Sequence, residues 1–247
     1  MLATMMGTMP ALAAEGIRNI KRAMSRFTLN KQQFPLAYDN KWGGLISTSI
    51  FVTGDPGVDF GNSHYNDHHF HYGYFVFAAA CIVHSENIMY GRSQFLDENR
   101  DWVNNLVRDV ANPSDLDPYF PVSRAFDWFH GHSWAKGIFE SGDGKDEEST
   151  SEDYNFAWAM KMWGMVSGDA AMESRGALML GVMHRSINEY MYLMPSNTSH
   201  PANFLKNRVS GIASVSHAVP GVLRAGTDDV SPLSSLRTRS TVRRTLA

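Results

Sequence analysis

Hydrophobic positions recur with helical spacing along most of this chain, which predicts a mainly α-helical protein. The helical segments that this spacing indicates run over residues 11–29, 67–90, 96–111, 151–166 and 170–194. Ser151 is a suitable N-cap for the fourth segment, while Pro113 and Pro195 end the third and the fifth. One short run, at 44–53, is strand-like.

Two long segments between these helices, 34–66 and 113–150, are rich in glycine and aromatic residues. Loops longer than about 15 residues in a compact domain are usually functional or disordered. The tryptophans and tyrosines in these two segments favour a functional role. We therefore expect helices with long functional loops gathered at one end.

The C-terminal part of the chain differs in composition from the rest. Residues 221–247 are rich in Ser, Thr and Arg and contain no aromatic residue. Low periodicity and low hydrophobicity are typical of disorder, although a basic tail can also bind an acidic partner. We expect a divergent, disordered tail at 211–247, which follows one helical domain at 1–210.

Composition and charge narrow the function classes. With 43% hydrophobic residues in 247, the chain can build a real core. A formal net charge of -3 gives no electrostatic reason to expect binding of nucleic acid. The sequence contains no apolar run of about 18 residues, so it does not predict a membrane span. Cys81 is the single cysteine, so the chain cannot form an internal disulfide. Nothing in the sequence specifies an oligomeric state.

The first residues invite a signal-peptide interpretation because residues 1–16 are apolar and contain many small side chains. However, this stretch begins without a positive charge and is broken by Gly7 and Pro10. A surface helix through Ile17, Ile20 and Met24 explains it better.

The densest chemistry lies at residues 63–74, SHYNDHHFHYGY. One hypothesis is a metal-dependent hydrolase whose ligands are His64, Asp67, His68 and His71, although the spacing matches no familiar zinc signature. In the other hypothesis, burial beside aromatic residues raises the pKa of Asp67, so that its carboxyl group donates a proton. A structural role remains a third interpretation.

A second polar cluster, DGKDEESTSED, occupies residues 143–153. Such a segment is usually a solvated acidic loop. Here it lies between the aromatic stretches FDWFHGHSWAKG and NFAWAMKMW, which suggests carboxylates that face a sugar-sized cleft. Glu148 and Glu152 are four residues apart and share a face if the helix begins slightly early. Paired carboxylates are the groups that glycoside hydrolysis requires.

The motifs YNDHHFHYGY, GHSWAKG and DGKDEESTSE, in this order, resemble the catalytic core of glycoside hydrolase family 81. WGGLIS and DFGNSHYND, which precede and lead into the first motif, also match. The resemblance runs from about Lys31 to Met194. It implies an endo-1,3-β-D-glucanase that hydrolyses internal β-1,3-glucosidic bonds with inversion, without a metal or an organic cofactor. It also implies secretion or a cell-wall location.

The resemblance assigns roles to individual residues. Asp67 matches the general acid, and Glu148 and Glu152 match two essential glutamates, of which we favour Glu152 as the base with Glu148 assisting. The residues that it suggests for substrate contact are Trp42, Tyr65, His71, Tyr72, Tyr74, Asp127, His132 and Trp134. Among these, aromatic rings would stack on glucose units.

One departure from the family concerns length. Family members are several hundred residues longer, and their motifs lie in an (α/α)6 toroid. The resemblance therefore implies a partial (α/α)6 toroid with long active-site loops, in which some apolar helix faces are uncovered. Activity of the chain by itself is a separate hypothesis, and a non-catalytic glucan-binding remnant is its alternative.

Overall fold

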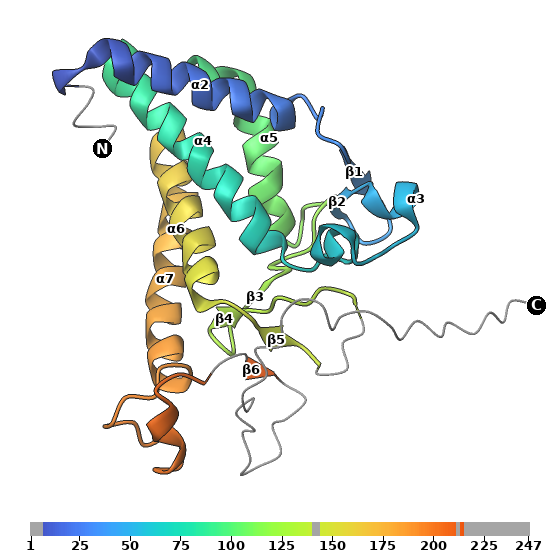
Figure 1. The fold of residues 1–247 in the computed structure, drawn as a ribbon, viewed down its shortest axis with the longest axis vertical. Helices are drawn as coiled ribbons and strands as arrows, with labels where there is room; N and C mark the ends of the chain where they lie inside the picture. Colours follow the sequence, from blue (N-terminus) through green and yellow to red (C-terminus); the bar gives the residue numbers. More distant parts are fainter. Residues whose placement is uncertain (1–6, 140–143, 211–212, 215–247) are drawn as a thin grey trace, which may run out of the picture.

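Five long helices carry the fold in the computed structural model, which describes residues 7–139, 144–210 and 213–214. The helices are α2 (Pro10–Thr28), α4 (His68–Tyr90), α5 (Gln94–Ala111), α6 (Thr150–Ser167) and α7 (Ala170–Tyr190). They confirm the mainly helical prediction and all five helical segments. α2 crosses the upper ends of α4 and α5, while α6 and α7 run side by side (Figure 1).

Helix α4 lies at the centre because α2, α5 and α6 all pack against it. Its sequence is apolar on several faces, as expected for a helix that has neighbours on several sides. Val76, Ala79 and Val83 are completely buried in the core. Phe77 of α4 and Trp158 of α6 are nevertheless exposed.

A buried carboxylate fixes the relative positions of three helices at the upper end. Glu86 of α4 is 3% exposed and accepts a hydrogen bond of 2.5 Å from Lys21 Nζ on α2. Its other oxygen accepts bonds from Ser93 Oγ (2.7 Å) and from the backbone N–H of Phe95 (2.9 Å), at the start of α5. The charge is therefore compensated by donors from both neighbours.

The long loops contain short elements. Strands β1 (Leu36–Asp39) and β2 (Gly44–Ser47) form an antiparallel hairpin, followed by α3 (Ser49–Thr53) and the 3-10 helix η1 (Val58–His64). The second long loop contributes β3 (Phe126–Asp127), β4 (His132–Ser133) and β5 (Asp146–Glu147). The strands β3 and β4 pair with each other, and β5 pairs with β6 (Ala213–Ser214). A further 3-10 helix, η2, spans Phe204–Asn207.

The strand predicted at 44–53 is correct only in its first half. β1 begins at Leu36, opposite Ser47, so β2 has no partner beyond that point. The backbone turns into α3 instead, and the N–H of Phe51 bonds to the carbonyl of Thr48. The predicted tail at 211–247 contains β6, and the remainder of it lies outside the described residues.

The end of α7 also differs from the sequence prediction, which extended this helix to Met194. After Tyr190 the chain leaves the helix and pairs with residues near 209. The N–H of Leu193 donates to the carbonyl of Arg208, and the N–H of Ser210 donates to the carbonyl of Met191. Over the described part of the chain, we find no helix with the length and apolar character needed to cross a bilayer.

Glycines allow α6 and α7 to approach closely. A Cβ atom added to Gly176 of α7 would lie 2.6 Å from the backbone nitrogen of Lys161 on α6. This is closer than any Cβ contact that packing tolerates, and a backbone atom cannot move away cheaply. Gly181, on the same helix, has no atom within 4 Å of its added Cβ.

We predict opposite effects of alanine at these two glycines. Gly176→Ala should lower the free energy of unfolding because it separates α6 from α7, while Gly181→Ala should raise it by about 0.5–1 kcal/mol because alanine is the better helix former. Urea denaturation of both variants and of the wild type measures the difference. Equal stabilisation by both substitutions would contradict the close helix packing.

Candidate active site

Asp67 lies at the turn that begins α4. Its backbone is left-handed, with φ 59°, and Tyr65 two residues earlier has φ 65°. Such conformations cost about 1–3 kcal/mol each and cluster at functional sites. The side chain is 9% exposed, and Oδ1 has no hydrogen-bond partner among the described residues. The turn therefore holds a carboxyl group in a largely dry position.

The loop at 135–138 holds this turn in place. The N–H of Asp67 donates to the carbonyl of Ala135 at 2.8 Å, and the N–H of Ile138 donates to the carbonyl of His64 at 2.8 Å. Between them, the N–H of Gly137 donates to Asn66 Oδ1 at 2.9 Å. A Cβ at residue 137 would lie 2.2 Å from the carbonyl oxygen of His64, so only glycine fits.

The same loop brings the acidic segment to Asp67. The N–H of Ala135 donates to the carbonyl of Asp146 in β5, at 2.8 Å, and Glu148 follows this strand directly. Glu152 lies in the first turn of α6, where its Oε1 accepts a 2.9 Å hydrogen bond from the Tyr74 hydroxyl of α4. Because α4 and α6 begin at the same end of the molecule, their first turns bring Asp67 and Glu152 to one region (Figure 1).

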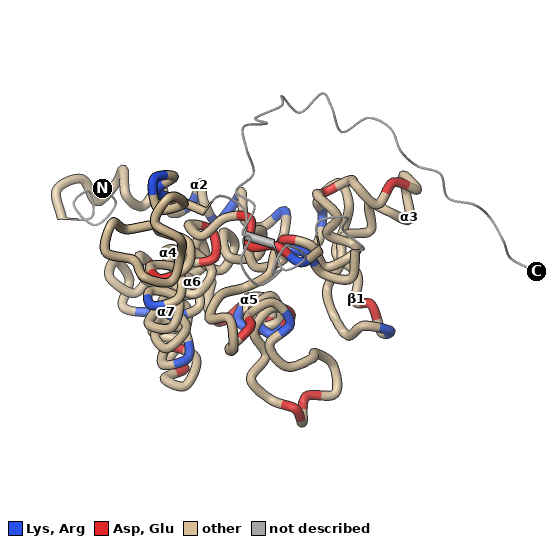
Figure 2. Tube along the Cα trace, turned by 90° about the horizontal axis from the view of Figure 1, so that it is seen from below, with Lys and Arg blue, Asp and Glu red and all other residues tan. Residues whose placement is uncertain are grey.

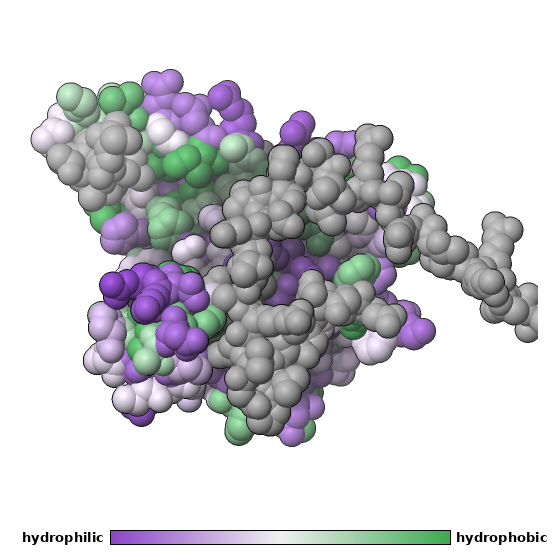
Figure 3. Space-filling view, turned by 60° about the horizontal axis from the view of Figure 1, so that its bottom comes forward, coloured by the Kyte–Doolittle hydropathy of each residue, from purple (hydrophilic) through white to green (hydrophobic). Residues whose placement is uncertain are grey.

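Seen from below, acidic and basic positions lie close together near the middle of the molecule (Figure 2). In the space-filling view, hydrophilic surface lies in the hollow at the middle of the face, and a hydrophobic area lies above and to its left (Figure 3).

Electrostatics favour a protonated Asp67. Burial raises its pKa to about 7, and the negative charge of Glu148 adds to the effect, followed by smaller contributions from Asp146 and Glu152. Lys136 opposes the shift, and its Nζ lies 3.7 Å from carboxylate oxygens of both Asp146 and Glu148. At slightly acid pH, Asp67 therefore holds a proton, as a general acid requires.

The histidines of the cluster do not converge. His68 uses both ring nitrogens, Nδ1 with Asp109 Oδ2 at 2.5 Å and Nε2 with the carbonyl of Asn62 at 2.8 Å. Burial lowers the pKa of His69 to about 3. The rings of His64 and His71 contact different aromatic side chains, Phe139 and Phe60. Within the described ranges, no three His, Cys, Asp or Glu side chains are grouped to hold a metal ion. The metal-site hypothesis therefore finds no ligand set here.

Three of the predicted substrate contacts are buried. Tyr65 is 4% exposed and donates its hydroxyl to Asp39 Oδ2 at 2.8 Å, while Tyr72 donates to the carbonyl of Leu45 at 2.6 Å. His132 is also buried, with its ring 4.6 Å from that of Trp134. The rings of Tyr65 and His132 pack against protein, which gives little support to the prediction that they contact substrate. Tyr72 is buried as well, but it also lines a cavity between α2, α4 and α5.

The other predicted contacts are accessible. Trp42 and Tyr74 are exposed, and His71 and Trp134 are half-buried. Asp127 orients Trp134 by accepting a 3.1 Å bond from its indole Nε1. Burial alone would raise the pKa of Asp127, but bonds from Trp134, His130 and the backbone hold it well below its usual range. Asp127 therefore positions the indole of Trp134.

Sequence reasoning missed two buried carboxyl groups beneath the site. Glu147 is 1% exposed, and burial raises its pKa to about 8, with Asp153 as the next cause. Asp153 is completely buried, which raises its pKa to about 6, and it accepts a 2.7 Å bond from the N–H of Ser133. The sequence did contain one signal for the burial of Glu147. Side chains alternate between the two faces of a strand, so Glu147 and Glu148 point in opposite directions.

We predict that Glu147 makes stability depend on pH. Its pKa in the folded protein lies above the usual 4.5, so the folded protein binds more protons than the unfolded chain between pH 4.5 and about 8. Stability should therefore fall as pH rises through this range and then level off. Glu147→Gln mimics the protonated form and should flatten the decline, as measured by urea denaturation at several pH values. Asp101→Asn, at an exposed site on α5, is the control, and an unchanged pH dependence in Glu147→Gln would refute the assignment.

A buried carboxyl group with a raised pKa, influenced by the charges of nearby glutamates, is the kind of acid that glycoside hydrolysis requires. Residues 1–218 match the family model described as "Glycosyl hydrolase family 81 C-terminal domain". The chain therefore belongs to glycoside hydrolase family 81, which confirms the resemblance inferred from its motifs. The match is wider than the range from Lys31 to Met194.

Similar proteins are known from several organisms. A glucan endo-1,3-beta-D-glucosidase of Arthroderma benhamiae is 52% identical over 202 residues, covering 82% of this chain and 22% of the relative. The primary septum glucan endo-1,3-beta-D-glucosidase of Schizosaccharomyces pombe is 52% identical over 196 residues, covering 79% and 19%. A solved structure of a glycoside hydrolase family 81 mutant from Clostridium thermocellum has a TM-score of 0.67 at 25% identity and covers 86% of this chain and 28% of that one. The chain thus spans about a fifth of the length of these two curated relatives.

Proposed function

We propose that this chain carries the catalytic site of an endo-1,3-β-D-glucanase, which hydrolyses internal β-1,3-glucosidic bonds with inversion. The observation that carries the proposal is the buried Asp67, whose pKa is raised to about 7 next to Glu148 and Glu152. The names of the similar proteins support the same substrate. We also propose that the helices form part of an (α/α)6 toroid, as the likeness to the solved family member supports.

In the proposed reaction, Asp67 donates its proton to the glycosidic oxygen as the bond to the anomeric carbon breaks. A water molecule attacks the anomeric carbon from the opposite face and gives its proton to a carboxylate. In inverting enzymes the two carboxyl groups are roughly 6.5–9.5 Å apart, which leaves room for this water. Exchange with solvent then returns a proton to Asp67 and removes one from the base.

Glu152 is our choice for the base. The hydroxyl of Tyr74 bonds to Oε1 of Glu152 and orients the carboxylate, which leaves Oε2 to accept the proton of the attacking water. Glu148 assists in a different way, because its charge favours the protonated form of Asp67. Lys136, at 3.7 Å, keeps Glu148 close to the site.

Accessible side chains supply the contacts to substrate in this proposal: Trp42, His71, Tyr74 and Trp134. The rings of Trp42 and Tyr74 can pack on the C–H faces of glucose units. A glucan substrate of this kind is a wall polymer, and the name of the fission yeast relative refers to the primary septum. We accordingly propose that the protein acts after secretion or in the cell wall, on β-1,3-glucan and without a cofactor.

Replacement of the acid should abolish most of the activity. We predict that Asp67→Asn lowers kcat on laminarin by about 100-fold to 10,000-fold, because proton donation to the leaving group is lost. In the wild type, activity should decline as pH rises through about 7, because Asp67 then loses its proton. Glu148→Gln should move this decline to lower pH, since it removes a charge that favours the protonated acid.

Circular dichroism checks that the variants fold, and Asp101→Asn serves as the exposed control. Hydrolysis by Asp67→Asn at the wild-type rate would show that Asp67 is not the acid. Binding of insoluble glucan by the wild type without release of sugars would favour the non-catalytic alternative.

Product stereochemistry and chemical rescue identify the base. Inversion predicts that the first product released from the β-linked glucan is the α-anomer, which NMR distinguishes from the β-anomer. We predict that azide restores turnover in Glu152→Gln, because a small anion can occupy the place of the activated water. It should not restore turnover in Glu148→Gln. Rescue of Glu148→Gln alone would exchange the roles of the two glutamates.

A further inference from the structure

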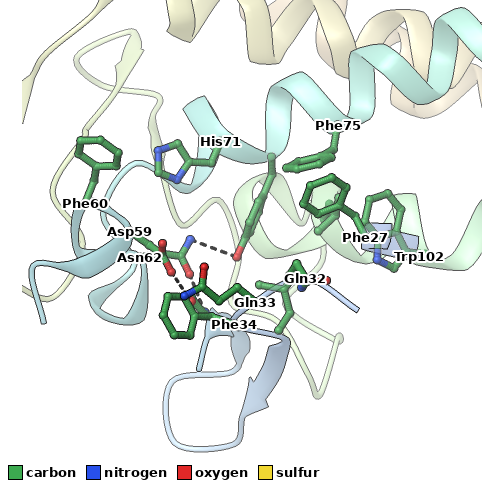
Figure 4. A pocket seen from close by; sticks show the side chains of 14 residues that line it. Phe27, Gln32, Gln33, Phe34, Asp59, Phe60, Asn62, His71, Phe75 and Trp102 are labelled. Carbon is green, nitrogen blue, oxygen red and sulfur yellow. Dashed lines mark hydrogen bonds between the residues drawn. The ribbon is translucent and has the colours of Figure 1, made fainter. Parts of the chain in front are cut away.

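A cavity of about 370 Å³ lies at the first turns of α4 and is not lined by Asp67, Glu148 or Glu152. Its walls come from the last turn of α2, the first turns of α4, the middle of α5, η1 and the segment at 32–36 (Figure 4). The volume is at the lower end of the range for small-molecule pockets, roughly 300–1,000 Å³.

One side of this cavity is aromatic. The rings of Phe27 and Phe75 are 4.7 Å apart between centroids, and the ring of Trp102 meets Phe75 edge-on at 6.1 Å. Phe34 and Phe60 add two further rings to the lining, on the side of Asp59 and Asn62 (Figure 4). Flat rings of this kind suit the C–H faces of a pyranose, which are apolar and nearly flat.

The other side is polar. Asn62 and Asp59 line it, and both are held by Ser47, whose N–H donates to Asn62 Oδ1 at 2.6 Å and whose hydroxyl donates to Asp59 Oδ2 at 2.5 Å. Planar amides and carboxylates fixed in this way are suitable partners for sugar hydroxyl groups. The combination of the two sides fits a carbohydrate better than a wholly apolar ligand.

Gln32 provides the sharpest indication of a hydroxyl-bearing ligand. Its Nε2 donates to Asn30 Oδ1 at 2.8 Å, but its Oε1 is buried and has no hydrogen-bond partner among the described residues. A buried acceptor without a partner costs about 1–3 kcal/mol. A hydroxyl group that entered the cavity would satisfy it, whereas an apolar ligand would not.

His71 connects this cavity with the carboxylates. Its ring lies edge-on to the exposed ring of Phe60, 5.8 Å away, and Figure 4 shows the two side chains together at one end of the cavity. His71 precedes Tyr74 by three residues on α4, so the two side chains share a helix face, and the Tyr74 hydroxyl bonds to Glu152 Oε1 at 2.9 Å. A glucan chain held at Asp67 and Glu152 can therefore continue past His71.

We propose that this cavity is a subsite for one glucose unit of the β-1,3-glucan chain that the carboxylates hold. The aromatic side packs on the ring, and Gln32 accepts a hydrogen bond from one of its hydroxyl groups. The proposal rests on the proposed function for the identity of the ligand. It implies that oligosaccharides long enough to reach the cavity bind more tightly than shorter ones.

Titration calorimetry with laminari-oligosaccharides of increasing length tests the subsite without requiring turnover. Gln32→Leu removes the acceptor at similar volume, and Phe60→Ala removes an exposed ring at the end of the cavity. Each should weaken the binding of long oligosaccharides by about tenfold, the effect of losing roughly 1.4 kcal/mol, and leave the binding of short ones unchanged.

Gln94→Leu and Phe129→Ala are matched controls at exposed positions away from the cavity, and they should bind all lengths like the wild type. Hydrolysis rates on the same oligosaccharides are measured in parallel. Binding that is unchanged by Gln32→Leu and Phe60→Ala at every length, or absent from the wild type, overturns the subsite. Length-dependent binding without hydrolysis in the wild type would instead overturn the catalytic proposal and retain the subsite.

Discussion

A buried hydrogen bond between Asp109 of α5 and His68 of α4 is the interaction on which the site depends. Both side chains are essentially inaccessible, and Asp109 also accepts a 2.8 Å bond from the N–H of Leu45 in β2. The guanidinium of Arg124 lies 3.9 Å away. Helix α4, helix α5 and two loops are thereby joined at the residue that follows Asp67. A carboxyl group buried in this way requires its hydrogen-bond partners, so the position of Asp67 is coupled to the integrity of the core.

The N-terminal end of α4 therefore contributes to both the candidate active site and the neighbouring cavity. The first residue of α4 fixes the acidic Asp67 in its left-handed turn, and the next two turns supply His71 and Phe75 to the neighbouring cavity. Residues four apart share a helix face, so His71 and Phe75 line the same wall. Reaction site and proposed subsite are therefore aligned by the same buried bond, and a shift of α4 would displace both.

The concentration of carboxyl groups around Asp67 is costly for folding but useful for proton transfer. Oxygens of Asp67, Asp146, Glu147 and Asp153 are buried without partners among the described residues. Burial of like charges raises the pKa values of these groups, and Lys136 supplies one opposing charge. Sites whose chemistry needs a neutral acid beside ionised carboxylates commonly contain such locally unfavourable arrangements.

Hydrophobic spacing and capping residues are local properties, so the five helices could be predicted from the sequence, apart from the end of α7. The motifs also identified the family, and they single out Asp67, Glu148 and Glu152 as the candidate carboxyl groups of the proposed reaction. Burial was decided only by the tertiary structure. Tyr65 and Tyr72 resembled sugar-stacking residues and are core, while Glu147 resembled a solvated side chain and is inaccessible. Whether a side chain is covered by protein depends on segments that are distant in the chain. The loop at 135–138, which packs against the turn at Asp67, is an example, and the sequence around either segment does not indicate this contact.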